Sequence, residues 1–367
     1  MWGSQIYDSA NLWSNDPSIS RWGCTLTSAA MVFNYHGINN MPDNTPLNPG
    51  TLNTWLKSNN GNFRNGLVNW VSLQRLSKIA PHSGSTIFNA LEFSKVNSAN
   101  IAQLTSDIQN GNPPILEVPD HYVVAKGIQG SSFSINDPFY ARLSLNEYGN
   151  TFLSMRRFIP SNTDLSYIVV VADENVDVLL VNPEGDTTGD QGIEQPIGDP
   201  IGGATTTAVP LKILYLPKPE TGTYRLNFSS PNQMQYTSDI YGYDIDGNLK
   251  KETFIGKVGN EEEDDYAIEF NKDEGIIDII PPPITFGDLR DDIKEFYEQG
   301  KIKKLTYGLL LIELGVAEKV SVKSRKTTEK LLIILRATIQ REKGRGIGPA
   351  AANVLIDEVN SLISQYN

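Results

Sequence analysis

Three residues of types that cooperate in nucleophilic catalysis lie far apart in this sequence: Cys24, His121 and Asp137. Cys24 is the chain's one cysteine, so an intramolecular disulfide is impossible. A thiol attacks carbonyl carbons efficiently when an imidazole takes its proton and a third group fixes the imidazole tautomer. The sequence therefore predicts Cys24 as a nucleophile, His121 as its base and then acid, and Asp137 as the residue that orients His121.

The residues after Cys24 predict an amphipathic helix. Leu26, Ala29 and Phe33 fall on one face at helical spacing, and Gly37 is a typical stop. Cys24 would then begin the helix, where unpaired backbone N–H groups supply partial positive charge that favours a thiolate.

A β-hairpin is predicted around His121 and Asp137. Residues 121–128 and 133–137 are strand-like, with a turn between them. If the turn centres on Gly130, Asp137 shares the face of His121 as its diagonal neighbour, and Asn136 points away. A one-residue register slip would reverse that choice.

A chain of 367 residues predicts several domains, because one hydrophobic core rarely serves so many residues. Helix and strand signals mix at the front, short Val-, Ile-, Leu- and Tyr-rich runs fill the middle, and helical periodicity returns after three prolines. The fold class expected is multidomain: an α+β domain over residues 1–162, an all-β immunoglobulin-like sandwich over 163–280, a Pro-rich linker at 281–284, and a small all-α helical bundle over 285–367.

The charge distribution argues against some partners. The net charge is −12, and the acidity is concentrated in residues 161–285. An acidic surface repels phosphate backbones, so no nucleic-acid partner is expected.

No apolar run approaches the ~20 residues that cross a bilayer, so no transmembrane segment is predicted. The three dispersed histidines give no support for a zinc site, and the catalysis proposed for Cys24 requires neither a metal nor an organic cofactor. The acidic runs Glu184–Asp190 and Glu261–Asp265 do not follow EF-hand spacing, so a solvated acidic face is expected there, with calcium binding as the alternative. His36 closes the Cys24 helix, where the helix dipole favours a cation.

Two sequence groups resemble a known family. Trp22–Val32 with Tyr35–Gly37 is similar to the nucleophile helix of bacterial papain-like peptidases related to bacteriocin-processing (double-glycine) peptidases, and His121–Val124 with Asn136–Pro138 is similar to their histidine strand and Asp-Pro motif. The resemblance covers about residues 1–160 and implies a papain-like fold that hydrolyses peptide bonds in a peptide or protein substrate.

The same resemblance assigns a glutamine to the oxyanion hole. Ser18 occupies the position six residues before Cys24 where papain-like enzymes often place it, whereas Gln5 matches a subgroup with longer spacing. Gln5 is therefore expected to complete the catalytic set with Cys24, His121 and Asp137.

The C-terminal part is similar to the FIMAH-type helical modules of extracellular bacterial enzymes, and the middle part to their β-sandwich accessory modules. That likeness implies secretion or cell-surface attachment and a partner there. Residues 1–4 carry no signal-peptide features, which fits either a cytosolic protein or a trimmed mature chain. Two alternative functions remain: an inactive surface adhesion or scaffold protein that keeps the fold, and acyl transfer to an amine, as in transglutaminases.

Overall fold

The structure is a computed structural model that describes residues 2–83, 88–196, 198–199, 203–259, 263–280 and 284–366. It divides into two compact units, Met1–Ile280 and Pro281–Asn367. The three prolines of the predicted linker lie outside the described residues. A domain boundary at residue 162 stays a prediction.

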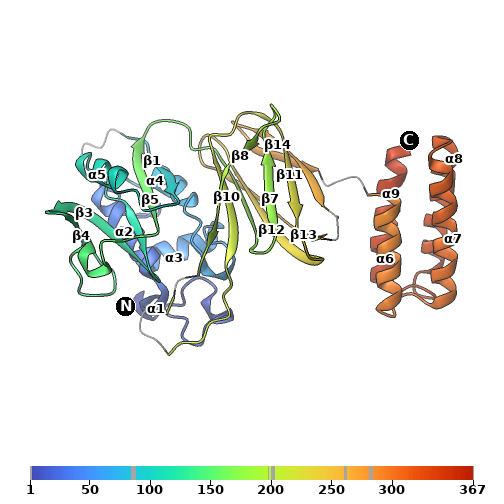
Figure 1. The fold of residues 1–367 in the computed structure, drawn as a ribbon, viewed down its shortest axis with the longest axis horizontal. Helices are drawn as coiled ribbons and strands as arrows, with labels where there is room; N and C mark the ends of the chain where they lie inside the picture. Colours follow the sequence, from blue (N-terminus) through green and yellow to red (C-terminus); the bar gives the residue numbers. More distant parts are fainter. Residues whose placement is uncertain are drawn as a thin grey trace. The chain divides into compact units, whose positions relative to one another are not determined.

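The front of the first unit is an α/β region (Figure 1). The predicted nucleophile helix is present as α2, and Leu26, Ala29 and Phe33 are buried on its inner face. Short 3-10 turns accompany the helices at Trp2–Ser4, Ala10–Leu12, Arg64–Gly66 and Leu145–Tyr148. The helices are α1 (Ile19–Trp22), α2 (Cys24–Tyr35), α3 (Pro49–Ser58), α4 (Ser72–Ile79) and α5 (Ile101–Gln109).

A five-stranded antiparallel sheet in the order β1-β5-β2-β3-β4 carries this region. Its hairpin β3–β4 is the predicted one, and Val124 pairs with Asn136. The turn is one residue longer than a turn centred on Gly130, but an irregularity between Ala125 and Gly127 restores the expected register. The strands are β1 (Ala90–Val96), β2 (Ile115–Val118), β3 (His121–Gln129), β4 (Ser132–Asn136) and β5 (Ser154–Ser161).

Two further five-stranded antiparallel sheets follow, in the orders β13-β12-β6-β10-β9 and β15-β14-β11-β7-β8. Side chains from both sheets meet in one apolar core. An immunoglobulin-type topology for this pair of sheets stays a prediction. The strands are β6 (Tyr167–Asp173), β7 (Asp177–Val181), β8 (Thr187–Thr188), β9 (Asp190–Glu194), β10 (Leu211–Pro217), β11 (Gly222–Ser229), β12 (Met234–Tyr243), β13 (Leu249–Val258), β14 (Asp264–Asn271) and β15 (Gly275–Ile280).

Strand β6 joins the α/β region to the paired sheets, because both of its faces are buried. Ile168 and Val170 point into the core between the two sheets. Tyr167 and Val169 point the other way, into the core that holds α2 and β1. Alternate side chains of a strand face opposite sides, so one strand serves two cores. The α/β region therefore shares its core with residues beyond 162.

The second unit is all helical. Thr285 caps its first helix and forms a capping box with Asp288. Four helices surround one apolar core. No helix in the described part of the chain is long and apolar enough to cross a membrane. The helices are α6 (Phe286–Glu298), α7 (Lys304–Ser321), α8 (Arg325–Glu342) and α9 (Pro349–Tyr366).

Candidate active site

Cys24 is the first residue of α2, directly after the short helix α1. Gly23 makes that junction possible. A Cβ atom at Gly23 would lie 2.5 Å from the carbonyl oxygen of Ile19, closer than atoms pack. The glycine thus lets the two helices meet without a clash and places the thiol at the N-terminus of α2. Cys24 is buried, with 8% of its surface exposed.

His121 opens strand β3 beside the same end of α2. The turn before it depends on Asp120, whose φ of 57° is left-handed. Helix and strand are joined by a hydrogen bond that the hydroxyl of Ser28 donates to the carbonyl of Tyr122, 3.3 Å away. The backbone of Tyr122 also makes a hydrogen bond to Cys24 that lowers the pKa of the thiol. The fold therefore brings Cys24 next to the residue that follows His121.

Asp137 holds the imidazole of His121. Its Oδ1 atom lies 2.8 Å from Nε2 of His121 and also accepts the backbone N–H groups of Phe139 at 2.9 Å and Tyr140 at 2.8 Å. A carboxylate only accepts, so Nε2 carries the proton and Nδ1 of the neutral ring has the free lone pair. That Nδ1 atom is buried and has no hydrogen-bond partner among the described residues.

Aromatic side chains surround the His121 ring, which is 3% exposed. The ring centroids of Phe139, Tyr140 and Tyr148 lie 6.3, 5.6 and 6.5 Å from that of His121. The hydroxyl of Tyr148 donates to Oδ2 of Asp137. The guanidinium of Arg142 lies 4.4 Å from the Tyr148 ring centroid. Sequence reasoning missed Tyr148, because an aromatic residue eleven positions after Asp137 carries no local signal.

The pKa shifts of the carboxyl and the thiol run in opposite directions. Burial alone would raise the pKa of Asp137, but hydrogen bonds from His121, Tyr148 and two backbone amides hold it below its usual value. Burial raises the pKa of Cys24 to about 12, and the charge of Asp137 adds to the rise. The helix N-terminus favours the thiolate, but burial acts in the opposite direction and keeps the pKa of the thiol above its ordinary value.

The hydrogen bond of Gln5 is made to α1 and not to Cys24. Its carbonyl accepts the backbone N–H of Ile19 at 2.8 Å, which ties it to α1. Within the described ranges no hydrogen bond joins its side chain to Cys24. Gln5 instead lines a surface groove of about 700 Å³ that runs along α3, together with Met41, Asp43, Asn48, Thr51 and Trp55.

The other histidines play no part in this arrangement. His36 is buried and packs against Phe88, with ring centroids 6.2 Å apart. Burial lowers the pKa of His36 to about 4, so the cation expected at the end of α2 is absent at neutral pH. Nε2 of His82 donates a hydrogen bond to the carbonyl of Ser77, 2.6 Å away. The described residues contain no group of three or more His, Cys, Asp or Glu able to hold a metal.

Comparison with known families supports a papain-like peptidase segment in the α/β region. Residues 8–157 match the model of the Peptidase_C39 like family, which covers less than half of the 367-residue chain. A search of the curated proteins and a search of the solved structures found no match. The likeness of the C-terminal unit to FIMAH-type modules has no support from these comparisons.

Proposed function

We propose that the protein is a cysteine peptidase that hydrolyses peptide bonds with Cys24, His121 and Asp137. One observation carries the proposal: the His121 imidazole is fixed through Nε2 to Asp137, and its Nδ1 is buried and unpartnered within the described residues, beside the backbone that contacts Cys24. Nucleophilic catalysis needs an oriented base with a free lone pair, and this one lies one residue from the backbone that contacts the thiol. The family match over residues 8–157 agrees with it.

The raised thiol pKa determines how the first step proceeds. Cys24 is protonated at neutral pH, so Nδ1 of His121 takes the proton as Sγ bonds to the substrate's carbonyl carbon. The imidazolium then donates that proton to the leaving amine as the C–N bond breaks, which leaves a thioester. Water then attacks the thioester, and Nδ1 accepts the water's proton. The C–S bond breaks, the acid product leaves, and Sγ takes the proton back from the ring.

Asp137 stabilises the imidazolium that forms in both steps, because its carboxylate is ionised and accepts from Nε2. Gln5 and the backbone N–H of Cys24 are proposed to hold the oxyanion. For Gln5 this requires its exposed side chain to turn from the groove toward the thiol when substrate binds. The remaining sheets and the helical unit are proposed to act at the cell surface or outside the cell, where they attach or space the peptidase.

Cleavage of a peptide library tests the proposal. Wild-type protein is expected to yield new N-termini by mass spectrometry, and Cys24→Ala and His121→Ala are each expected to abolish them. His82→Gln serves as the matched control, since His82 lies outside the site and its loss leaves cleavage intact. An added primary amine separates hydrolysis from transfer, because an amide product would show acyl transfer. A library left whole by the wild type would exclude peptide hydrolysis.

A second candidate is an inactive surface adhesion or scaffold protein. One observation favours it: Cys24 and His121 are 8% and 3% exposed, and the large groove along α3 is lined by Gln5 rather than by the thiol. Under this alternative His121→Ala changes neither the alkylation rate of Cys24 nor any cleavage.

A further inference from the structure

Two acidic residues beyond the segment that matches the family model pair with arginines that lie near the candidate site. Glu194 ends strand β9 of the second sheet, and Asp199 follows in the connection from β9 to β10. Each carboxylate forms an ion pair with an arginine inside the matched segment, residues 8–157: Glu194 with Arg156 and Asp199 with Arg21. Arg156 lies beside Tyr122 on β3, the strand that carries His121, and this side is called the histidine half. Arg21 lies on α1, directly before the helix that begins with Cys24, and this side is called the cysteine half.

Glu194 acts on the histidine half. Its Oε2 atom lies 2.6 Å from Nη2 of Arg156, and its other oxygen pairs with Lys95. Arg156 has no exposed surface, and its guanidinium lies 5.0 Å from the ring centroid of Tyr122, the residue after His121. A buried arginine needs carboxylate partners to stay in place. Glu117 pairs with Nη1 of the same guanidinium at 2.6 Å, so Glu194 and Glu117 together fix the cation that supports the start of β3.

The carboxylate of Glu194 is ionised in this position. Burial raises its pKa, but the charges of Arg156 and Lys95 bring it below the ordinary value. Glu194 also lines a small internal cavity of about 10 Å³ with Thr25 and Tyr122. The acidic end of β9 therefore reaches the space between α2 and β3, directly behind the candidate site.

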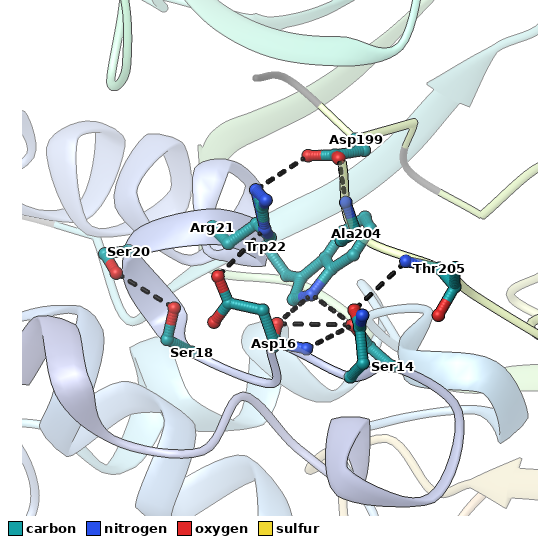
Figure 2. A network of polar contacts seen from close by, with 10 residues as sticks. Ser14, Asp16, Ser18, Ser20, Arg21, Trp22, Asp199, Ala204 and Thr205 are labelled. Atoms are coloured by element: carbon teal, nitrogen blue, oxygen red, sulfur yellow. Dashed lines mark hydrogen bonds and ion pairs between the residues drawn. The ribbon is translucent and has the colours of Figure 1, made fainter. Parts of the chain in front are cut away.

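Asp199 contacts the chain before the nucleophile helix, and Figure 2 shows its carboxylate between Arg21 and the backbone of Ala204. Its Oδ1 atom lies 3.2 Å from Nη1 of Arg21, and its Oδ2 accepts the backbone N–H of Ala204 at 2.8 Å. Arg21 also bonds Asp16 through Nε at 3.0 Å, and the carbonyl of Asp16 accepts the indole N–H of Trp22 at 2.7 Å. Arg21 and Trp22 form the end of α1, which leads through one glycine to Cys24.

The same connection touches the residue before His121. A Cβ atom at Gly198 would lie 2.5 Å from the side chain of Asp120, so the backbone at Gly198 packs tightly against that turn. Further along, Thr205 and Thr207 donate backbone N–H bonds to Asn15 and Trp13, at 3.0 and 2.9 Å. The described residues of the connection are therefore tied to both chain segments that lead into the site.

We propose that Glu194 and Asp199 are positioning residues of the candidate active site, so that the working catalytic unit extends beyond residue 162 into the second sheet. Glu194 sets β3 through Arg156, and Asp199 sets the α1–α2 junction through Arg21. The proposal rests on the proposed function for its kinetic consequence, because reacting atoms displaced by about 1 Å lose on the order of a hundredfold in rate.

The test compares Asp199→Asn and Glu194→Gln with Asp177→Asn in the full chain. Asp177 pairs with Lys212 in the same paired sheets, its side chain is largely exposed, and neither residue pairs with Arg21 or Arg156, so it is the control. Asp199→Asn and Glu194→Gln are expected to lower kcat about tenfold or more with little change in KM, since they disturb geometry rather than substrate contacts. Asp199→Glu keeps the charge and is expected to recover most of the rate.

A purely structural role would lower Tm without this kinetic split. Unchanged kcat in Asp199→Asn overturns the proposal, and so does a faster reaction, which would mean that the connection obstructs the site. If Glu194→Gln fails to fold, Asp199→Asn decides alone, because its carboxylate is less buried than that of Glu194.

A second readout separates this inference from the proposed function. The ¹⁵N signals of the His121 ring report its position and hydrogen bonding whether or not the protein cleaves peptides. They are expected to shift in Asp199→Asn and Glu194→Gln and to stay unchanged in Asp177→Asn. A wild type that cleaves nothing but shows these shifts would exclude the peptidase and retain the positioning role. Unshifted signals in both variants would exclude the positioning role.

Discussion

Nε2 of His121 lies 2.8 Å from Oδ1 of Asp137, and Nδ1 on the other side of the same ring is buried without a hydrogen-bond partner in the described part of the chain. This relationship fixes the tautomer and leaves one basic nitrogen free. Asp137 accepts four hydrogen bonds in all. One comes from His121, and the other three, from Tyr148 and two backbone amides, hold the carboxylate in place.

Removing the charge of Asp137 should disable the base. In Asp137→Asn the amide can donate to Nε2 and favour the wrong tautomer, so kcat is expected to fall by about 10²–10⁴-fold. Tyr148→Phe removes one hydrogen bond to the carboxylate and should have a smaller effect, about tenfold or less. Asn136→Ala is the control, because Asn136 bonds Lys126 instead. Steady-state kinetics on a cleaved peptide measures all three, and equal rates in Asp137→Asn and wild type would contradict the assignment.

Gln5 has two possible roles that kinetics separates. If its amide holds the oxyanion, Gln5→Ala lowers kcat by about 10²–10³-fold and leaves KM nearly unchanged. If Gln5 only lines the groove along α3, KM rises and kcat persists. We expect the first result. Trp55→Ala is the companion variant, since Trp55 lines the same groove and should change KM alone.

Burial of the thiol should make the protein less stable in alkali. An unfolded chain loses the Cys24 proton near pH 9, whereas the folded chain keeps it until about pH 12. The folded state then binds more protons, so the free energy of unfolding falls as pH rises, by about 1.4 kcal/mol per pH unit from this group. Urea unfolding of wild type and Cys24→Ala between pH 8 and 10.5 measures the slope. Parallel slopes would show that the thiol is not desolvated.

His36 should make the protein sensitive to acid. Its pKa is lowered to about 4. Between pH 6.5 and 4 the unfolded chain therefore binds a proton at this ring, whereas the folded chain does not. Stability is therefore expected to fall between pH 6.5 and 4, by about 2 kcal/mol after allowance for partial exposure. His36→Gln removes the titrating group and should flatten the curve over this range. A wild type and variant that lose stability equally would contradict the shift.

The local features of the site were predictable from sequence. The helical period of α2 and the β3–β4 hairpin depend on neighbouring residues, and both elements are present. The preference for Asp137 over Asn136 depended on register, and the irregularity between Ala125 and Gly127 preserved the expected pairing.

Features that depend on distant residues were not predictable. Strand β9 is polar and short, so no hydrophobic period marks it. The role of Glu194 at its end depends on ion pairs with Arg156 and Lys95, which are distant in the sequence. The position of Cys24 at a helix N-terminus, which favours a thiolate, can be predicted from the sequence. The burial of the Cys24 thiol, which raises its pKa, depends on tertiary packing and could not be predicted from the sequence.

The central claim is that His121 activates Cys24, and alkylation of Cys24 with and without His121 measures this directly. Iodoacetamide and an E-64-type epoxide would be added at neutral pH, and the modified Cys24 quantified by intact and peptide mass spectrometry. The account predicts stoichiometric labelling of wild type by the epoxide and its loss in His121→Ala, with His82→Gln labelled like wild type. Equal labelling of wild type and His121→Ala, or none in either, would contradict it.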